Sequence, residues 1–344
     1  MLYTVSSTER TNEKATEYET KALLYLMNFM SDSDEIHYFV VDFFNDLTGI
    51  DSLADKAWDV QSKGESNIYS KRVGQYLVTL FKNYLSEFNF INFILFVGGI
   101  SSNALQNPDL EVFGINNFTA KAIQSIKEGL KETSTQKEYI NNNDITDNNI
   151  NSFLEKVSFV ISTKNKADYI KKFIKLNPSI IPSDEYLNKV FDQIRDRQSI
   201  KKNINTENIT ISTLSGFEPY KKYITTKEIK LLVLNRLIFK DNISKTDIPI
   251  SFSVVTRQQN LSNIKEFIED CNNDIYRMLF DKNNIDAFWK LFEEIYHRVC
   301  NNSELDVNQI YNLIDREKLN NVSFLNFNSA KYFIALIKDG IEHD

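Results

Sequence analysis

The stretch Ala57-Trp58-Asp59-Val60-Gln61-Ser62-Lys63 decides the fold class of this chain. Its side chains alternate in an extended backbone, so that Trp58 and Val60 face one way and the polar set faces the other: Asp59, Gln61 and Lys63. Such alternation predicts a half-buried strand with one polar face. The preceding Gly49-Ile50-Asp51 reaches this strand through a short hairpin. We therefore expect the side chains of Asp51 and Gln61 to converge near one end of a sheet.

The flanking segments extend this strand into a small α/β unit. Apolar residues at three- and four-residue spacing predict a helix, aromatic and β-branched runs predict strands, and Thr48-Gly49 and Gly98-Gly99 predict breaks. The elements expected, in chain order, are a helix at 12–30, strands at 36–44, 50–53 and 57–63, a helix at 69–85 and a strand at 88–97. The order α-β-β-β-α-β fits a mixed sheet flanked by helices. We place this α/β core in residues 1–103.

Residues 104–344 predict a mostly α-helical region. The helices expected there lie at 119–132, 164–176, 184–202, 226–238, 264–280 and 285–300, with short strands at 157–162 and 209–212. The segment 141–151 is nearly all Asn, Asp and Thr and predicts an exposed connection. An apolar stripe of Phe288, Leu291, Phe292 and Ile295 predicts either helical core or a surface for another helix.

Charge and cysteine content narrow the function classes. The formal net charge of -7 argues against a uniformly basic protein that coats DNA. Residues 1–100 hold 8 Lys+Arg and 14 Asp+Glu, so the acidic excess lies in the α/β core. The two cysteines, Cys271 and Cys300, have no metal-binding spacing and suit a reducing compartment. With no signal-peptide core and no apolar run of spanning length, we expect a cytoplasmic protein without membrane attachment.

The hairpin carries residue types that suit metal-dependent hydrolysis of phosphodiesters. Mg²⁺ or Mn²⁺ accepts carboxylate, amide and backbone oxygens, which Asp51, the Gln61 side chain and the Ser62 carbonyl would supply. The Lys63 ammonium would orient the attacking water or stabilise charge on the phosphate. The sequence therefore predicts a catalytic cation site around Gln61-Ser62-Lys63.

This pattern resembles the PD-(D/E)xK nuclease superfamily, in the Mrr-like variant with Gly-x-Asp followed by Gln-x-Lys. The matching residues are Gly49, Asp51, Gln61 and Lys63. The family also carries Glu or Gln on its first helix after an aromatic residue, where Glu19 follows Tyr18 here. The resemblance implies a restriction-endonuclease-like core, a Mg-dependent endodeoxyribonuclease activity, and a further catalytic and metal-binding role for Glu19.

The match to the family pattern is incomplete. No proline precedes the candidate Asp, and an amide stands where an acidic residue is usual. Three other carboxylates compete with Asp51 as the metal ligand: Asp46, Asp55 and Asp59. Asp59 is the sharpest rival, because it shares the polar strand face of Gln61 and Lys63.

The layout is also similar to nuclease subunits of bacterial antiphage defence, both those linked to cyclic-oligonucleotide signalling and those of Lamassu systems. That resemblance implies double-stranded DNA as substrate, homo-oligomers, and a regulatory partner such as an SMC-like ATPase. Residues 104–344 would then serve assembly, DNA clamping or partner docking. The alternative is a catalytically inactive nuclease-fold scaffold. Two basic pairs, Lys201-Lys202 and Lys221-Lys222, are candidate phosphate contacts.

Overall fold

The computed structural model describes residues 3–5, 13–174, 182–204, 206, 209–237, 248–259 and 263–342. The chain divides into two compact units, the first formed by Met1–Tyr169 and Phe191–Thr226 and the second by Ile170–Val190 and Lys227–Asp344. The boundary expected near residue 103 does not coincide with this division, because the sheet of the first unit continues beyond it.

A mixed seven-stranded sheet forms the centre of the first unit. Its parallel part joins β4 to β5 and β5 to β7, and every other pairing in it is antiparallel. The order across the sheet is β6 (Val112–Phe113), β7 (Val157–Ile161), β5 (Phe90–Val97), β4 (Ala57–Lys63), β3 (Leu47–Asp51), β2 (Ile36–Val41) and β9 (Tyr223–Thr225). A separate antiparallel pair joins β1 (Tyr3–Val5) to β8 (Ile209–Ile211). The predicted mixed α/β sheet is thus present.

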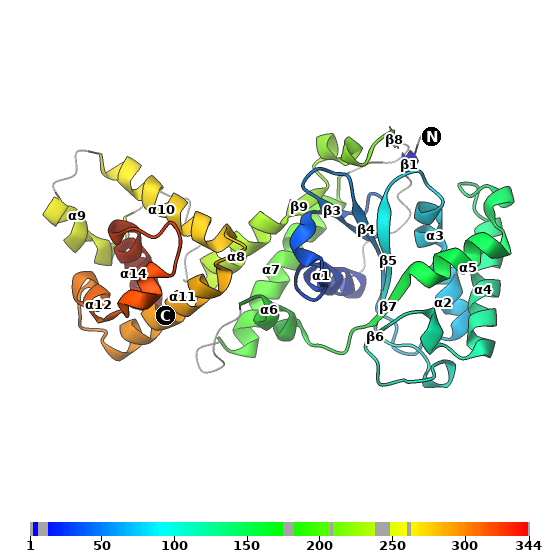
Figure 1. The fold of residues 1–344 in the computed structure, drawn as a ribbon, viewed down its shortest axis with the longest axis horizontal. Helices are drawn as coiled ribbons and strands as arrows, with labels where there is room; N and C mark the ends of the chain where they lie inside the picture. The colour runs from blue at the N-terminus through cyan, green and yellow to red at the C-terminus, as the bar shows by residue number, and fades with distance from the viewer. Residues whose placement is uncertain are drawn as a thin grey trace. The chain divides into compact units, whose positions relative to one another are not determined.

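Helices cover both faces of this sheet (Figure 1). Helix α1 (Glu13–Asn28) packs on one face, and α3 (Val78–Tyr84) packs on the other. Beyond α3 lie α2 (Ser70–Tyr76), α4 (Ala120–Thr135) and α5 (Asp147–Lys156). Aromatic rings fill the α3 side, where the ring of Phe81 lies 5.3 Å from that of Phe153 and the ring of Tyr84 lies 5.9 Å from that of Phe93. The chain order α1, β2, β3, β4, α2–α3, β5 matches the predicted order, with the second helix divided at Leu77.

The predicted break at Thr48-Gly49 is wrong, because both residues lie inside β3. Gly49 pairs with Trp58 of β4, and a Cβ atom at Gly49 would approach Ile36 to 3.1 Å. The glycine therefore allows close packing within the sheet layer instead of ending a strand. The chain turns earlier, where Asp42 adopts a left-handed backbone with φ of 47° and its N–H donates to the Asp46 carbonyl over 3.2 Å.

The exposed connection expected at 141–151 is also wrong in part. A short 3-10 turn, η4 (Asn142–Asp144), is followed by α5, which begins at Asp147. The side chain of Thr146 caps that helix by accepting from the N–H of Asn149. One face of this helix is buried through Ile150, Phe153 and Leu154. The end of the segment is therefore the polar first turn of an amphipathic helix.

All six helices expected later in the chain are confirmed. These are α4, α6 (Lys166–Ile174), α7 (Asp184–Lys202), α8 (Thr226–Leu237), α10 (Ile264–Phe280) and α11 (Ile285–Asn301). The expected ends at Asn12, Leu176 and Ile238 lie outside the described residues. Besides α5, four helices of the described residues were not expected: α9 (Ser253–Gln259), α12 (Val307–Leu313), α13 (Arg316–Asn320) and α14 (Phe327–Glu342).

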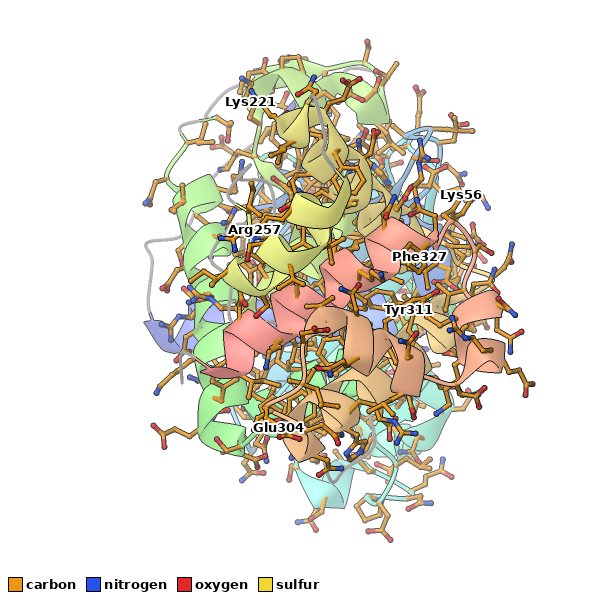
Figure 2. All side chains as sticks on the ribbon, turned by 90° about the vertical axis from the view of Figure 1, so that its left-hand side faces the viewer. Lys56, Lys221, Arg257, Glu304, Tyr311 and Phe327 are labelled. Carbon is orange, nitrogen blue, oxygen red and sulfur yellow. The ribbon has the colours of Figure 1, made fainter. Side chains whose placement is uncertain are left out.

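The second unit is helical and buries the predicted apolar stripe of α11 against its own α14. The ring of Phe333 on α14 stacks 5.6 Å from Phe288 and lies 6.0 Å from Phe292. At the first residue of α14, Phe327 contacts Tyr311 of α12 edge-on at 5.0 Å, and both are labelled in Figure 2. The stripe is therefore core of this chain, which removes it as evidence for self-association.

Candidate functional site

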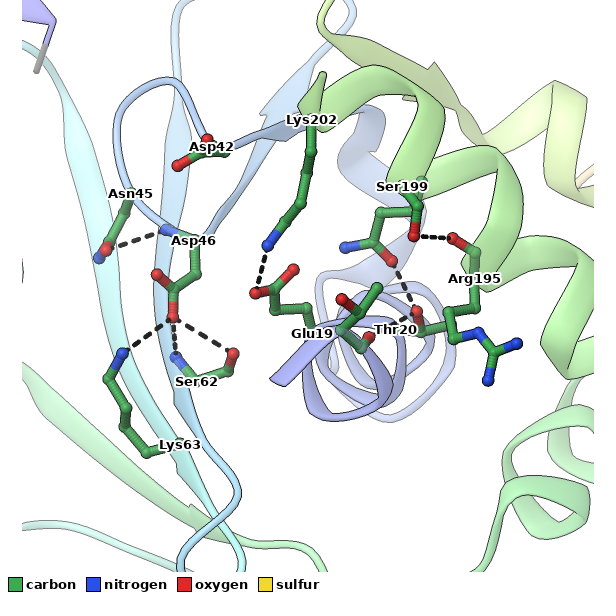
Figure 3. Close-up of polar contacts among 12 residues, drawn as sticks. Glu19, Thr20, Asp42, Asn45, Asp46, Ser62, Lys63, Arg195, Ser199 and Lys202 are labelled. Atoms are coloured by element: carbon green, nitrogen blue, oxygen red, sulfur yellow. Dashed lines mark hydrogen bonds and ion pairs between the residues drawn. The ribbon is translucent and has the colours of Figure 1, made fainter. Parts of the chain in front are cut away.

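The C-terminal end of β4 presents Gln61, Ser62 and Lys63 around the carboxylate of Asp46, and Figure 3 shows the contacts of Ser62 and Lys63. Asp46 Oδ2 accepts from Gln61 Nε2 at 2.6 Å, from the Ser62 N–H at 2.9 Å and from Ser62 Oγ at 3.3 Å. Lys63 Nζ lies 3.8 Å from the same oxygen. The side chains of Lys63 and Asp46 are only 19% and 14% exposed, so this ion pair is shielded from most of the solvent.

The turn between β2 and β3 fixes the position of Asp46. The Asn45 side chain accepts from the Asp46 N–H at 3.0 Å. Lys222, whose side chain is 1% exposed, donates to the Asp42 carbonyl at 2.9 Å and lies 3.5 Å from the Asp42 carboxylate. Burial lowers the pKa of the Lys222 ammonium, and the Asp42 charge opposes that shift. Lys222 thus stabilises the left-handed turn that presents Asp46 and is not a surface phosphate contact.

Glu19 on α1 brings a second carboxylate to this region. Its Oε1 atom accepts from Lys202 Nζ at 2.5 Å, and the Glu19 side chain is 4% exposed. Burial raises the pKa of the Glu19 carboxyl to about 7; Lys202 opposes the shift, and the negative charges of Asp46 and Asp42 increase it. Its Oε2 atom is buried and has no hydrogen-bond partner among the described residues. A buried oxygen without a donor is costly and therefore suits a cation ligand.

Helix α7 holds Lys202 beside α1. Thr20 Oγ1, next to Glu19, donates to Gln198 Oε1 of α7 at 2.8 Å, and both side chains are buried. Gln198 lies one helical turn before Lys202, so this bond fixes the height of the lysine along α1. Figure 3 shows Glu19, Asp42, Asp46 and Lys202 between α1 and the end of the sheet.

The structure does not bring Asp51 to Gln61, and the expected convergence is corrected. In the β3–β4 hairpin Ile50 pairs with Ala57 and Leu47 with Val60, so the register runs on to place Asp46, not Asp51, opposite Gln61. Asp51 lies at the turn, where its Oδ1 accepts from the N–H groups of Asp55 and Lys56 at 2.8 and 2.9 Å. Its carboxylate closes the hairpin instead of joining the site.

Asp59, the rival ligand, lies in the core beneath α3. It is fully buried, and its Oδ2 accepts from Asn83 Nδ2 at 2.6 Å. Burial raises the pKa of the Asp59 carboxyl to about 7, while the Asn83 hydrogen bond opposes the shift. The side-chain oxygen of Asn83, Oδ1, in turn accepts from the Tyr3 hydroxyl at 2.6 Å. This polar network ties β1, β4 and α3 together.

The site therefore combines expected and unexpected residues. Gln61, Ser62, Lys63 and Glu19 were expected, and Asp46 was only a competitor of Asp51. The ion pair between Lys202 and Glu19 was not expected from the sequence, because 183 positions separate the two residues. Counting back along an antiparallel hairpin would have found Asp46, whereas no local pattern points to the ion pair of Lys202.

The donor set fits a hard cation in part. Asp46 and Glu19 offer carboxylate oxygens, and Gln61 and the Ser62 backbone offer amide and carbonyl oxygens. Within the described residues, no group of three or more His, Cys, Asp or Glu side chains forms a metal site by itself. A cation here would thus depend on two carboxylates with neutral oxygens. The buried, unpartnered Oε2 of Glu19 is the atom that supports this fit.

Comparisons with known proteins leave the family of the chain open. No model of a protein family, no curated protein and no solved structure matches it. Among the helices of the described part of the chain, none has the length and apolar character needed to cross a membrane. The arrangement of Asp46, Gln61, Lys63 and Glu19 is therefore the basis for a proposed function.

Proposed function

We propose that the chain is a metal-dependent nuclease that hydrolyses the phosphodiester bonds of DNA, with Asp46 in the role expected for Asp51. The observation that carries the proposal is the meeting of Gln61, Ser62 and Lys63 on the Asp46 carboxylate. Asp46 comes directly before β3, and Gln61, Ser62 and Lys63 end β4, after a helix that supplies Glu19; this is the element order of the PD-(D/E)xK pattern. The assignment keeps the Gln-x-Lys motif and moves only the acidic residue.

Asp46 and Glu19 would hold Mg²⁺ or Mn²⁺, together with the Ser62 carbonyl and the Gln61 amide oxygen. The Gln61 amide group now donates through Nε2 to Asp46, which leaves its oxygen as an acceptor. A bound divalent ion would polarise the phosphate and lower the pKa of a water. The carboxylates would set the position of that charge at the end of β4.

Lys63 would act on the phosphate itself. Its ammonium is compact and carries three donors, so it can bind a phosphate oxygen and a water molecule at once. The ammonium lies 3.8 Å from Asp46 Oδ2 and 5.7 Å from the centre of the Tyr76 ring, and these two neighbours keep it at the site. Positive charge fixed where negative charge develops is an effective form of electrostatic catalysis.

Plasmid cleavage tests the proposal and the choice of carboxylate. The full-length chain is incubated with supercoiled DNA and Mg²⁺, Mn²⁺ or EDTA, and we expect metal-dependent nicking or linearisation. Asp46→Asn should reduce the rate about hundredfold or more, the size of effect seen when a charge-stabilising group is removed. Asp51→Asn is the matched control, because Asn still accepts from the turn N–H groups, and its rate should stay near wild type. Loss in Asp51→Asn with full activity in Asp46→Asn would reverse the assignment.

A second candidate, the inactive scaffold, is favoured by one observation. The ionic groups of the site are already paired within the chain, Lys63 with Asp46 and Lys202 with Glu19. Such internal neutralisation stabilises a fold without any metal. Wild-type protein that neither binds Mn²⁺ nor cleaves DNA under any condition tested would support the scaffold.

A further inference from the structure

Lys202 lies on the carboxylate that a cation would use. Its Nζ atom is 2.5 Å from Glu19 Oε1, a short charge-assisted bond, and the Lys202 side chain is only 14% exposed. The other oxygen of Glu19 is buried without a donor. The Lys202 ammonium thus neutralises one oxygen of the Glu19 carboxylate and leaves the other buried and unsatisfied.

We infer that Lys202 is a built-in occupant of the cation site, and that its ammonium and a divalent ion compete for Glu19. The competition follows from charge. An ammonium and a divalent ion on the same carboxylate would repel each other strongly in a region shielded from water. Tight metal binding therefore requires Lys202 to move off Glu19, which makes the end of α7 a restraint on the site.

The structure supplies a means for this restraint to act. Lys202 is the last residue of α7, whereas the Thr20–Gln198 bond holds the preceding turn of that helix to α1. The anchor and the competing charge are therefore separate residues. The long, flexible lysine side chain can leave Glu19 while Gln198 stays in place. A cation at the C-terminal end of a helix is also favoured there by the helix dipole, which helps keep Lys202 near this position.

The test is a titration with Mn²⁺, followed by electron paramagnetic resonance, on the full-length chain. At about pH 8, where carboxyl groups are largely ionised, Lys202→Met should bind Mn²⁺ at about tenfold lower concentration than wild type. Lys202→Arg keeps the charge and should stay at or above the wild-type concentration. Lys201→Met is the matched control, because it removes the same charge from the neighbouring position of α7, and it should leave Mn²⁺ binding unchanged.

Two further variants test whether Glu19 is the carboxylate in competition and whether the Lys202 charge is the cause. Adding Glu19→Gln to Lys202→Met should cancel the gain, because the carboxylate in competition is then absent. Lys202→Gln removes the charge but keeps a donor for Glu19, and it replaces Lys202→Met if thermal unfolding shows that the latter does not fold. A folded Lys202→Met or Lys202→Gln protein that binds Mn²⁺ no more tightly than wild type would overturn the inference.

A role of Lys202 in DNA cleavage rests on the proposed nuclease function. The competition for Glu19 and the nuclease proposal can nevertheless fail separately. If the Lys202 variants bind Mn²⁺ more tightly but no variant cleaves DNA, the competition stands and the nuclease proposal fails. If wild type cleaves DNA and its Mn²⁺ requirement is the same in Lys202→Met, the nuclease proposal stands and the competition fails.

Discussion

Asp46 shows how one side chain gathers the groups of the candidate site. Its Oδ2 atom accepts three hydrogen bonds and lies near the Lys63 ammonium. Two backbone features hold it in place: the left-handed residue Asp42 and the contact of Lys222 with that residue's carbonyl. A carboxylate that is positioned before any ligand arrives loses little conformational entropy on binding one.

At the scale of the residue, Lys63→Ala separates catalysis from stability. The ammonium lies 3.8 Å from Asp46 Oδ2, so its loss should lower the DNA cleavage rate about hundredfold or more. The fold should remain, because the core-facing Trp58 and Val60 are untouched. The rate is measured by plasmid cleavage, and the fold by circular dichroism.

Lys56→Ala provides the matched control for that change. Lys56 pairs with Glu35 at 2.7 Å, but both side chains are about half exposed. Such surface ion pairs contribute little to the free energy of unfolding. Its cleavage rate and melting temperature should stay near wild type. A folded Lys63→Ala protein that cuts at the wild-type rate would remove Lys63 from the mechanism.

At the scale of the element, the crossing of α2 and α4 depends on two glycines. A Cβ atom at Gly129 would lie 2.1 Å from the Lys71 carbonyl oxygen, and one at Gly74 would lie 2.0 Å from the Ile126 carbonyl oxygen. Both obstacles are backbone atoms, which cannot move aside as a side chain can. Glycine here lets the two helix backbones approach closely.

Gly129→Ala should therefore destabilise the first unit, although Ala favours a helix over Gly by about 1 kcal/mol. Overpacking costs about 1–3 kcal/mol, and a backbone obstacle places this substitution at the upper end of that range. Urea unfolding followed by circular dichroism measures the change. Gly114→Ala is the control, since a Cβ atom there meets nothing within 4 Å, and it should unfold at the wild-type urea concentration. A Gly129→Ala protein more stable than wild type would show that the helices can separate.

The strands and helices followed from local patterns more readily than the site did. Alternation in 57–63 predicted β4 with its observed bounds, but the predicted half-burial is wrong: Asp59 and Gln61 are buried as well as Trp58 and Val60, because helices cover both faces. The expected hairpin register depended on the role of Gly49, which either ends a strand or packs closely against Ile36. From sequence alone, a glycine at this position predicts the end of a strand. That choice, together with the Gly-x-Asp pattern, favoured Asp51 over its competitor Asp46. The contact of Lys202 with Glu19 is long-range and has no local signal.

At the scale of the whole molecule, the α/β core needs more of the chain than its motifs occupy. Strand β5 pairs on one side with β4 and on the other with β7, which begins at Val157. The α3 side of the sheet is covered by α5, whose Phe153 ring contacts Phe81, Tyr84 and Phe93. Lys202, which pairs with Glu19, and Lys222, which pairs with Asp42, come later still in the chain.

A fragment ending at residue 103 should therefore fail to fold, whereas one ending at residue 226, where the first unit ends, should fold. The shorter fragment leaves the edge of β5 unpaired and the rings of Phe81 and Phe93 uncovered, and both features promote aggregation. Light scattering and thermal unfolding separate the outcomes: we expect a monodisperse, cooperative transition only for residues 1–226. If residues 1–103 instead gave a monodisperse protein with a cooperative transition, the later strands and helices would be dispensable, and the site would have to function without Lys202 and Lys222. Mn²⁺ binding by the 1–226 fragment would show that the cation site needs no residue beyond 226, which leaves out most of the helical second unit.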